Sequence, residues 1–147
     1  MAVRAAAVLI PAVLLLHGFG ESRTVFDGLK KHLLTRGWAV MALDLRGHGA
    51  SEKLYDSALY PAAEMAEDAR RLLDHLGIPQ ADVMGYSMGA RIAAFLAVNH
   101  PERVTSLVFG GMGTSMVRGM AGLTSAITSR ALLIAAGMMS TDTPRLT

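Results

Sequence analysis

The chain has 147 residues, which is enough for one domain with a hydrophobic core. Hydrophobic residues make up 52% and charged residues 18%, so the composition is that of a globular protein and excludes a disordered chain. The net charge of +2 is too small and scattered for nucleic-acid binding, and the lack of cysteine excludes disulfides and thiolate metal sites. We expect a cytoplasmic protein that binds no membrane, metal or cofactor.

The first apolar run covers residues 5–16 and follows Arg4. A secretory signal is one interpretation, but Pro11 interrupts the run and no cleavage site of small residues follows. The run is also shorter than the roughly 20 residues that span a bilayer. We favour a buried parallel strand at 12–16, because such strands are continuously apolar. The glycine-rich turn at 17–20 (His-Gly-Phe-Gly) can face a ligand, and an ordinary strand-to-helix turn is the alternative.

The next two elements are a helix and a strand. Apolar residues recur on one helical face over residues 24–36, and Gly37 is a typical helix stop. A buried strand is predicted at 38–43. The loop at 44–51 (Asp-Leu-Arg-Gly-His-Gly-Ala-Ser) lacks the Gly-Lys-Ser/Thr sequence of a Walker loop, so we favour a structural role over phosphate binding.

The same alternation continues through the middle of the chain. Residues 61–76 form an amphipathic helix with proline in its first turn, and 88–99 form a more apolar helix. Strands are predicted at 82–86 and 104–109. Alternating strands and helices predict an α/β fold, in which helices cover both faces of a parallel sheet through right-handed crossovers.

The pattern changes after residue 113. We therefore divide the chain into a core at 1–113 and a helical segment at 114–147, with helices expected at 116–121 and 125–138. This Met-rich segment favours core helices, and a mobile lid over an apolar pocket is the alternative.

The residues that point to chemistry lie at 85–89, where Gly-Tyr-Ser-Met-Gly stands between a predicted strand and a predicted helix. This arrangement is typical of a nucleophile elbow. Gly85 and Gly89 leave room for a sharp turn that exposes the Ser87 hydroxyl. The backbone N–H of Met88 begins a helix, where it can stabilise a developing oxyanion.

The motifs at 17–20, 44–51 and 85–89, followed by His-Pro-Glu-Arg-Val at 100–104, resemble the α/β-hydrolase superfamily. The resemblance covers residues 12–113 and is strongest to single-domain esterases, lactonases and perhydrolases. It implies four strands in the spatial order 38–43, 13–16, 82–86 and 104–109.

The resemblance also implies a site. Ser87 would be the nucleophile, and the backbone N–H groups of Phe19 and Met88 would form the oxyanion hole. His17 would brace the turn that it forms with Gly18. Epoxide hydrolases and haloalkane dehalogenases of this fold use Asp where this chain has Ser. What remains is acyl transfer to water from a small ester, thioester, lactone or amide.

The chain departs from the family's pattern at the base and the acid, which normally follow the nucleophile in the order acid, then His. After Ser87 the only histidine is His100, about 18 Å away at the far end of a 12-residue helix. Glu102 and Asp142 are poorly placed as the acid. His48 is the one earlier histidine, apart from the bracing His17, in a loop at the strand ends, so it is the remaining candidate for a substitute base.

The family's N-terminal hairpin and C-terminal strands are also missing. We expect an incomplete hydrolase, which could be a fragment, a shortened version or a degenerate copy, and inactive alone. A non-catalytic protein that binds an apolar ligand or a partner on the same fold is the alternative. A dinucleotide-dependent oxidoreductase is excluded because Gly111 and Gly113 are followed by Met116 where a third glycine is needed.

The strand at 104–109 is expected to have no neighbour on one side. An open strand edge has unpaired N–H and C=O groups, and the strand contains no Lys or Pro to protect it. We therefore expect self-association through this edge.

Overall fold

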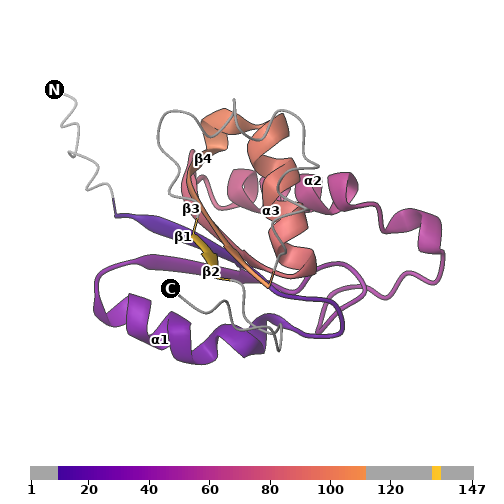
Figure 1. Cartoon of the computed structure of the whole chain (residues 1–147), viewed down its shortest axis with the longest axis horizontal. Helices are drawn as coiled ribbons and strands as arrows, with labels where there is room; N and C mark the ends of the chain where they lie inside the picture. Colours follow the sequence, from indigo (N-terminus) through magenta and orange to yellow (C-terminus); the bar gives the residue numbers. More distant parts are fainter. Residues whose placement is uncertain (1–9, 112–133, 137–147) are drawn as a thin grey trace, which may run out of the picture.

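The computed structural model describes residues 10–111 and 134–136 (Figure 1). Its centre is a parallel sheet in the spatial order β2-β1-β3-β4-β5. The strands are β1 (Ala12–Leu16), β2 (Ala39–Leu43), β3 (Ala81–Tyr86), β4 (Val104–Gly110) and β5 (Ile134–Ala136). The predicted α/β class and the predicted order of the first four strands are confirmed.

Within residues 10–111, three α-helices cover the two faces of this sheet. α1 (Asp27–Thr35) lies on one face, and α2 (Ala62–His75) and α3 (Met88–Asn99) lie together on the other (Figure 1). The helix predicted at 24–36 is shorter than expected, because its first turn is a 3₁₀ helix at Arg23–Phe26. The Ser22 hydroxyl caps that turn by accepting the Thr24 N–H at 3.4 Å. Two further 3₁₀ turns, Ser57–Leu59 and Pro101–Arg103, precede α2 and β4.

The core has one layer on each face of the sheet, because alternate strand residues point to opposite sides. On the α2 and α3 side, Leu14, Leu16, Val83, Leu107 and Phe109 are buried with the apolar faces of both helices. On the α1 side, Val13 and Leu15 pack with Phe26 in a smaller cluster. Burial on both faces explains why β1 is apolar at every position.

Two predictions at the C-terminal end are wrong. Residues 134–136, expected to be part of a helix at 125–138, form β5, and β5 pairs with residues 108–110 of β4. The edge of β4 is therefore not open along its whole length, because the backbone of residues 108–110 pairs with β5. Self-association through the remaining edge stays a prediction. The helix expected at 116–121, and most of the segment at 114–147, lie outside the described residues.

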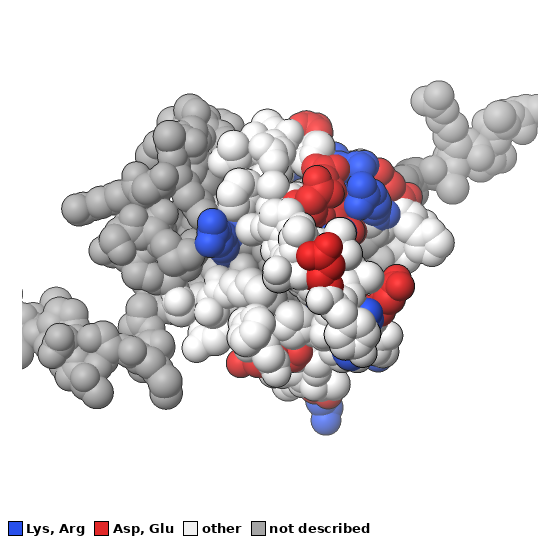
Figure 2. All heavy atoms as spheres, turned by 90° about the vertical axis from the view of Figure 1, so that its right-hand side faces the viewer, with Lys and Arg blue, Asp and Glu red and all other residues white. Residues whose placement is uncertain are grey.

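The carboxyl ends of the parallel strands meet at one edge of the sheet, where the loops after β1, β2 and β3 gather. Figure 2 shows the side of the molecule that holds the long connection from β2 to α2, and acidic and basic side chains are mixed among mostly uncharged atoms on it. Among the described residues, no helix combines the length and the apolar character needed to cross a membrane.

Candidate active site

Ser87 occupies a sharp turn between β3 and α3. Its backbone has φ 53° and ψ −113°, and within residues 10–111 it is the one non-glycine residue with positive φ. This conformation is strained for a residue with a Cβ, and surrounding contacts must maintain it. The Ser87 N–H donates to the Gly110 carbonyl at 2.8 Å, which anchors the turn to the end of β4. The side chain of Ser87 is exposed, as the strand–turn–helix prediction requires.

Gly85 and Gly89 permit this turn because no side chain fits at either position. A Cβ on Gly85 would overlap the Gly89 carbonyl and lie 2.5 Å from the Ala90 nitrogen. A Cβ on Gly89 would overlap the Leu16 carbonyl oxygen and lie 2.7 Å from the His17 carbonyl oxygen. The second glycine therefore allows the first turn of α3 to touch the end of β1, and the crowding expected from the sequence is confirmed.

That contact brings the turn after β1 beside Ser87. A Cβ placed on Gly18 would be 3.5 Å from the Ser87 Cβ, so these two residues are neighbours. Phe19 follows, and its side chain is 81% exposed. In the described part of the chain, the Phe19 and Met88 N–H groups donate to no protein acceptor. One of these two donors thus belongs to the residue after Ser87, and the other belongs to the turn that lies beside it.

His17 is completely buried and ties the turn after β1 to the backbone after β2. Its Nε2 accepts the Leu45 N–H at 3.0 Å, and its Nδ1 lies 2.8 Å from the Gly18 carbonyl oxygen. Because a neutral imidazole has one donor and one acceptor, Nδ1 carries the proton. Burial lowers the pKa of His17 and favours this neutral form. Both nitrogens are occupied, which fits the expected bracing role.

The loop at 44–51 is held by hydrogen bonds within itself, to the turn before α1 and to α2. The Asp44 carboxylate is 6% exposed and accepts the Arg23 N–H at 2.7 Å, the Arg23 guanidinium at 2.8 Å and the Ala50 N–H at 3.0 Å. Burial raises the pKa of Asp44, but these donors outweigh it and hold the pKa below its usual value. Arg46 forms a two-pronged ion pair with Asp68 of α2 at 2.6 and 2.8 Å. These contacts agree with a structural loop.

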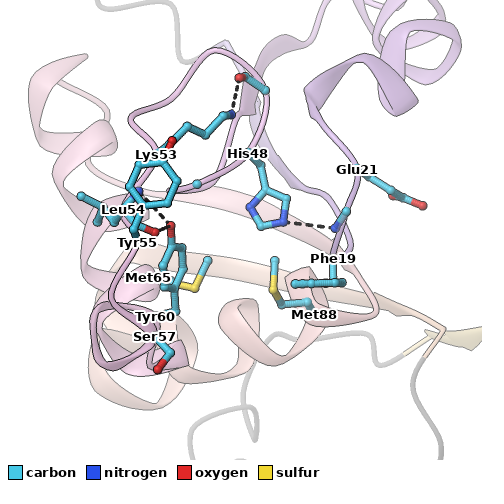
Figure 3. A pocket seen from close by; sticks show the side chains of 13 residues that line it. Phe19, Glu21, His48, Lys53, Leu54, Tyr55, Ser57, Tyr60, Met65 and Met88 are labelled. Carbon is cyan, nitrogen blue, oxygen red and sulfur yellow. Dashed lines mark hydrogen bonds between the residues drawn. The ribbon is translucent and has the colours of Figure 1, made fainter.

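A pocket of about 810 Å³ opens beside the serine turn (Figure 3). Its walls come from the turn after β1, the loop after β2, the segment before α2 and the first residue of α3. Six of the thirteen lining residues are apolar or aromatic: Phe19, Leu54, Tyr55, Tyr60, Met65 and Met88. Three are glycines, and the four polar or charged ones are Glu21, His48, Lys53 and Ser57. Ser87 is not one of the lining residues, but Met88, the next residue in the chain, and Phe19 are.

Tyr60 fixes the outer wall of this pocket, and sequence analysis gave no indication of that role. Its hydroxyl donates to the Leu54 carbonyl at 2.6 Å and accepts the Leu54 N–H at 3.1 Å. Its ring lies against Gly47, where any Cβ would collide with it. The residues around Tyr60 form no motif that would predict a hydrogen bond to a residue six positions earlier, so this contact is known only from the folded structure.

No histidine acts on Ser87 within the described residues. His100 lies at the other end of α3, where its Nε2 is 2.5 Å from Glu67 of α2. Arg70 and His100 together hold the pKa of Glu67 below its usual range. His48 stands in the pocket, but its Nε2 accepts the Gly20 N–H at 3.1 Å and its Nδ1 is 3.0 Å from the Arg46 carbonyl oxygen. Among the described residues, no histidine and carboxylate are both hydrogen-bonded at Ser87, and Asp142 lies outside these residues.

The described residues contain no cluster of three or more His, Cys, Asp or Glu side chains that could hold a metal ion. The chemistry available at this site is therefore that of an exposed hydroxyl, two uncommitted N–H groups and an apolar pocket.

Comparison with known proteins places this geometry in a family. Residues 11–126 match the profile of the alpha/beta hydrolase fold. The sn-1-specific diacylglycerol lipase of Mus musculus is 38% identical over 100 residues, which cover 67% of this chain and 32% of that protein. Epoxide hydrolase B of Mycobacterium tuberculosis is 37% identical over 108 residues, which cover 70% of this chain and 30% of that protein.

Solved structures agree with the sequence comparison. An epoxide hydrolase from Vigna radiata matches with a TM-score of 0.67 at 30% identity, over 69% of this chain and 32% of that one. Epoxide hydrolase A from Mycobacterium thermoresistibile matches with a TM-score of 0.67 at 28% identity, over 76% of this chain and 38% of that one. The chain spans about a third of the length of the curated relatives that it matches.

Proposed function

This chain belongs to the alpha/beta hydrolase family, and we propose from this premise that its Ser87 is the nucleophile of an acyl transfer to water. The observation that supports the proposal most is the Ser87 backbone, which two close glycine contacts hold exposed at φ 53°. A protein maintains such strain where a side chain must be presented in one orientation.

In the proposed reaction the Ser87 oxygen attacks the carbonyl carbon of an ester, thioester or lactone. A C–O bond forms to the serine, and the carbonyl oxygen becomes an oxyanion that accepts hydrogen bonds from the N–H groups of Met88 and Phe19. The bond from the carbonyl carbon to the leaving oxygen or sulfur then breaks, and the leaving group takes up a proton to become the alcohol or thiol. Water next adds to the carbonyl carbon of the acyl-serine, the C–O bond to Ser87 breaks, and the acid and the free Ser87 hydroxyl result. Each oxyanion donor contributes on the order of 10²–10³-fold to turnover in enzymes of this kind.

The proton of the Ser87 hydroxyl must pass to a base, and the described residues offer none. A serine hydroxyl is a weak nucleophile at neutral pH without a base. The oxyanion hole and binding alone can still give on the order of 10³-fold acceleration over water. We therefore expect slow acylation and slow deacylation by the described part of the site.

The pocket favours a small uncharged acyl compound as the substrate, since its six aromatic, leucine and methionine side chains outnumber its two charged ones, Glu21 and Lys53, which are of opposite sign. Epoxide opening, the activity named for several similar proteins, is disfavoured by the serine. Serine attack on an epoxide would form an ether, which has no carbonyl carbon for water to attack, so the enzyme could not turn over.

A second candidate is a non-catalytic protein that binds an apolar ligand on the same fold. One observation favours it: both imidazoles near the turn, His17 and His48, use both of their nitrogens in backbone hydrogen bonds. Such a protein would keep the pocket without needing a proton acceptor at Ser87.

The two candidates are separated by hydrolysis of p-nitrophenyl butyrate with and without added imidazole as a diffusible base. The proposal predicts an imidazole-dependent rate that Ser87→Ala abolishes. Ser106→Ala is the matched control, because its hydroxyl lies toward the opposite end of the strands and donates to Asp82 at 2.6 Å. Equal rates for wild type and Ser87→Ala at every imidazole concentration would refute catalysis by Ser87.

A further inference from the structure

We propose that His48 is a positioning residue: its imidazole holds the Phe19–Gly20 peptide group and thereby keeps the Phe19 N–H directed toward Ser87. This inference rests on the proposed function, because it assigns a role to His48 in the oxyanion hole. It also replaces the idea that His48 is a substitute base.

The hydrogen bonds of His48 fix the protonation of its ring. The Gly20 N–H can only donate, so Nε2 must be an acceptor at 3.1 Å (Figure 3). A neutral imidazole then carries its proton on Nδ1, which donates to the Arg46 carbonyl at 3.0 Å. The ring therefore bridges two segments that are 28 residues apart, and neither nitrogen is left to accept a proton from Ser87.

His17 and His48 hold the two peptide groups on either side of Phe19. His17 donates to the Gly18 carbonyl, which belongs to the same planar peptide group as the Phe19 N–H. His48 accepts the Gly20 N–H, which belongs to the next peptide group. With both planes held, the rotation of the Phe19 backbone is restricted, and so is the direction of its N–H.

The Phe19 side chain cannot supply this restraint itself, because it is 81% exposed. Its ring instead meets His48 edge to face, with centroids 5.8 Å apart and planes at 79°. The His17 ring is also close to His48, with ring centroids 5.0 Å apart. Gly20 has φ 76°, a conformation that glycine adopts at little cost and that does not hold the turn by itself.

Two amide variants of His48 test this role, since each reproduces one half of the imidazole. The carbonyl oxygen of His48→Gln can take the place of Nε2 and accept the Gly20 N–H. The amide nitrogen of His48→Asn can take the place of Nδ1 and donate to Arg46, but it leaves the Gly20 N–H without its acceptor. The pair therefore separates the contact to the turn from the contact within the loop.

We expect His48→Gln to retain kcat for p-nitrophenyl butyrate in imidazole to within about 3-fold, and His48→Asn to lower it about 10-fold or more with little change in KM. The loss is smaller than the 10²–10³-fold for removing an oxyanion donor, because the Phe19 N–H would be misdirected rather than absent. Hydrogen exchange of the Gly20 amide should be slow in wild type and His48→Gln and fast in His48→Asn.

A measurement on the wild type keeps the test independent of whether the variants fold. NMR of ¹⁵N-labelled protein should show a coupling across the hydrogen bond between the Gly20 nitrogen and His48 Nε2. Its absence, with the His48 proton on Nε2, would overturn the proposal. Equal kcat in the two variants would also overturn it, even if their Gly20 exchange differs. No Ser87-dependent hydrolysis by the wild type would instead overturn the proposed function, and this role with it.

Discussion

Gly28 and Gly89 offer the same substitution in two opposite environments. Each is the second residue of a helix, Gly28 in α1 and Gly89 in α3. A Cβ on Gly28 would meet nothing within 4 Å, whereas a Cβ on Gly89 would lie 2.5 Å from the Leu16 carbonyl carbon and 2.7 Å from the His17 carbonyl oxygen. Comparing Gly28→Ala with Gly89→Ala therefore isolates the close approach of α3 to the end of β1.

The expected magnitudes follow from these distances. In Gly89→Ala the start of α3 must move about 1 Å from β1 to restore ordinary contact, and such overpacking costs about 1–3 kcal/mol or more. The helix preference of alanine offsets about 0.5–1 kcal/mol of this. We expect a net loss of about 2 kcal/mol in the free energy of unfolding for Gly89→Ala, and a gain of about 0.5 kcal/mol for Gly28→Ala.

Urea unfolding followed by circular dichroism measures both values. The same shift would separate the Met88 and Phe19 N–H groups, and a misplacement of about 1 Å can lower turnover about 10²-fold. Gly28→Ala should leave the imidazole-dependent ester hydrolysis unchanged. The argument would be refuted if Gly89→Ala were as stable as wild type, because the first turn of α3 would then not depend on contact with β1.

Three further changes test other contacts around the site, each by urea unfolding. Asp44→Asn should lower the free energy of unfolding by about 2–4 kcal/mol, because the amide cannot accept hydrogen bonds from all three donors that the carboxylate serves. Asp56→Asn is the control and should change this free energy very little, because Asp56 is an exposed N-cap where Asn serves as well as Asp. Equal losses in the two variants would contradict this account. Tyr60→Phe should lower the free energy of unfolding by about 1–2 kcal/mol and weaken ligand binding in the pocket, since both hydrogen bonds to Leu54 are lost. Unchanged stability would show that the packing of the ring alone holds this wall of the pocket. Burial lowers the folded-state pKa of His17 below its ordinary 6.5, so the unfolded state binds more protons than the folded state, and the free energy of unfolding should fall as pH drops from about 7 to about 5. A free energy of unfolding that does not change with pH, or a pH dependence that persists in His17→Gln, would contradict the buried neutral form.

The sequence was sufficient to predict the strands with continuous apolar runs, because burial on both faces of a parallel sheet leaves that pattern. The sequence was also sufficient to predict the turn at 85–89. Gly85 and Gly89 stand on either side of Ser87 because a Cβ at either position would overlap neighbouring backbone atoms, as the structure shows. β5 could not be predicted, because three residues in a run of alanine, leucine and methionine fit a helix as well as a strand.

Partner choice was the other feature that the sequence did not contain. Asp44 and Arg46 are two residues apart and of opposite charge, yet Asp44 pairs with Arg23 and Arg46 with Asp68. The sequence placed His48 in a loop at the strand ends, but its bond to Gly20 depends on the spatial adjacency of β1 and β2. Such contacts are decided by the sheet order and not by local spacing.

The central claim is that Ser87 attacks a carbonyl carbon, and trapping the acyl-serine tests it most directly. The p-nitrophenolate group leaves far more readily than the serine oxygen, so with this ester acylation should be faster than deacylation, and the butyryl-serine should accumulate when the protein is incubated with p-nitrophenyl butyrate and imidazole. Intact mass spectrometry and peptide mapping should find one butyryl group on Ser87, removable by hydroxylamine as expected of an ester and absent from Ser87→Ala. Butyryl groups found only on lysines or the N-terminus, resistant to hydroxylamine and equal in Ser87→Ala, would contradict the account.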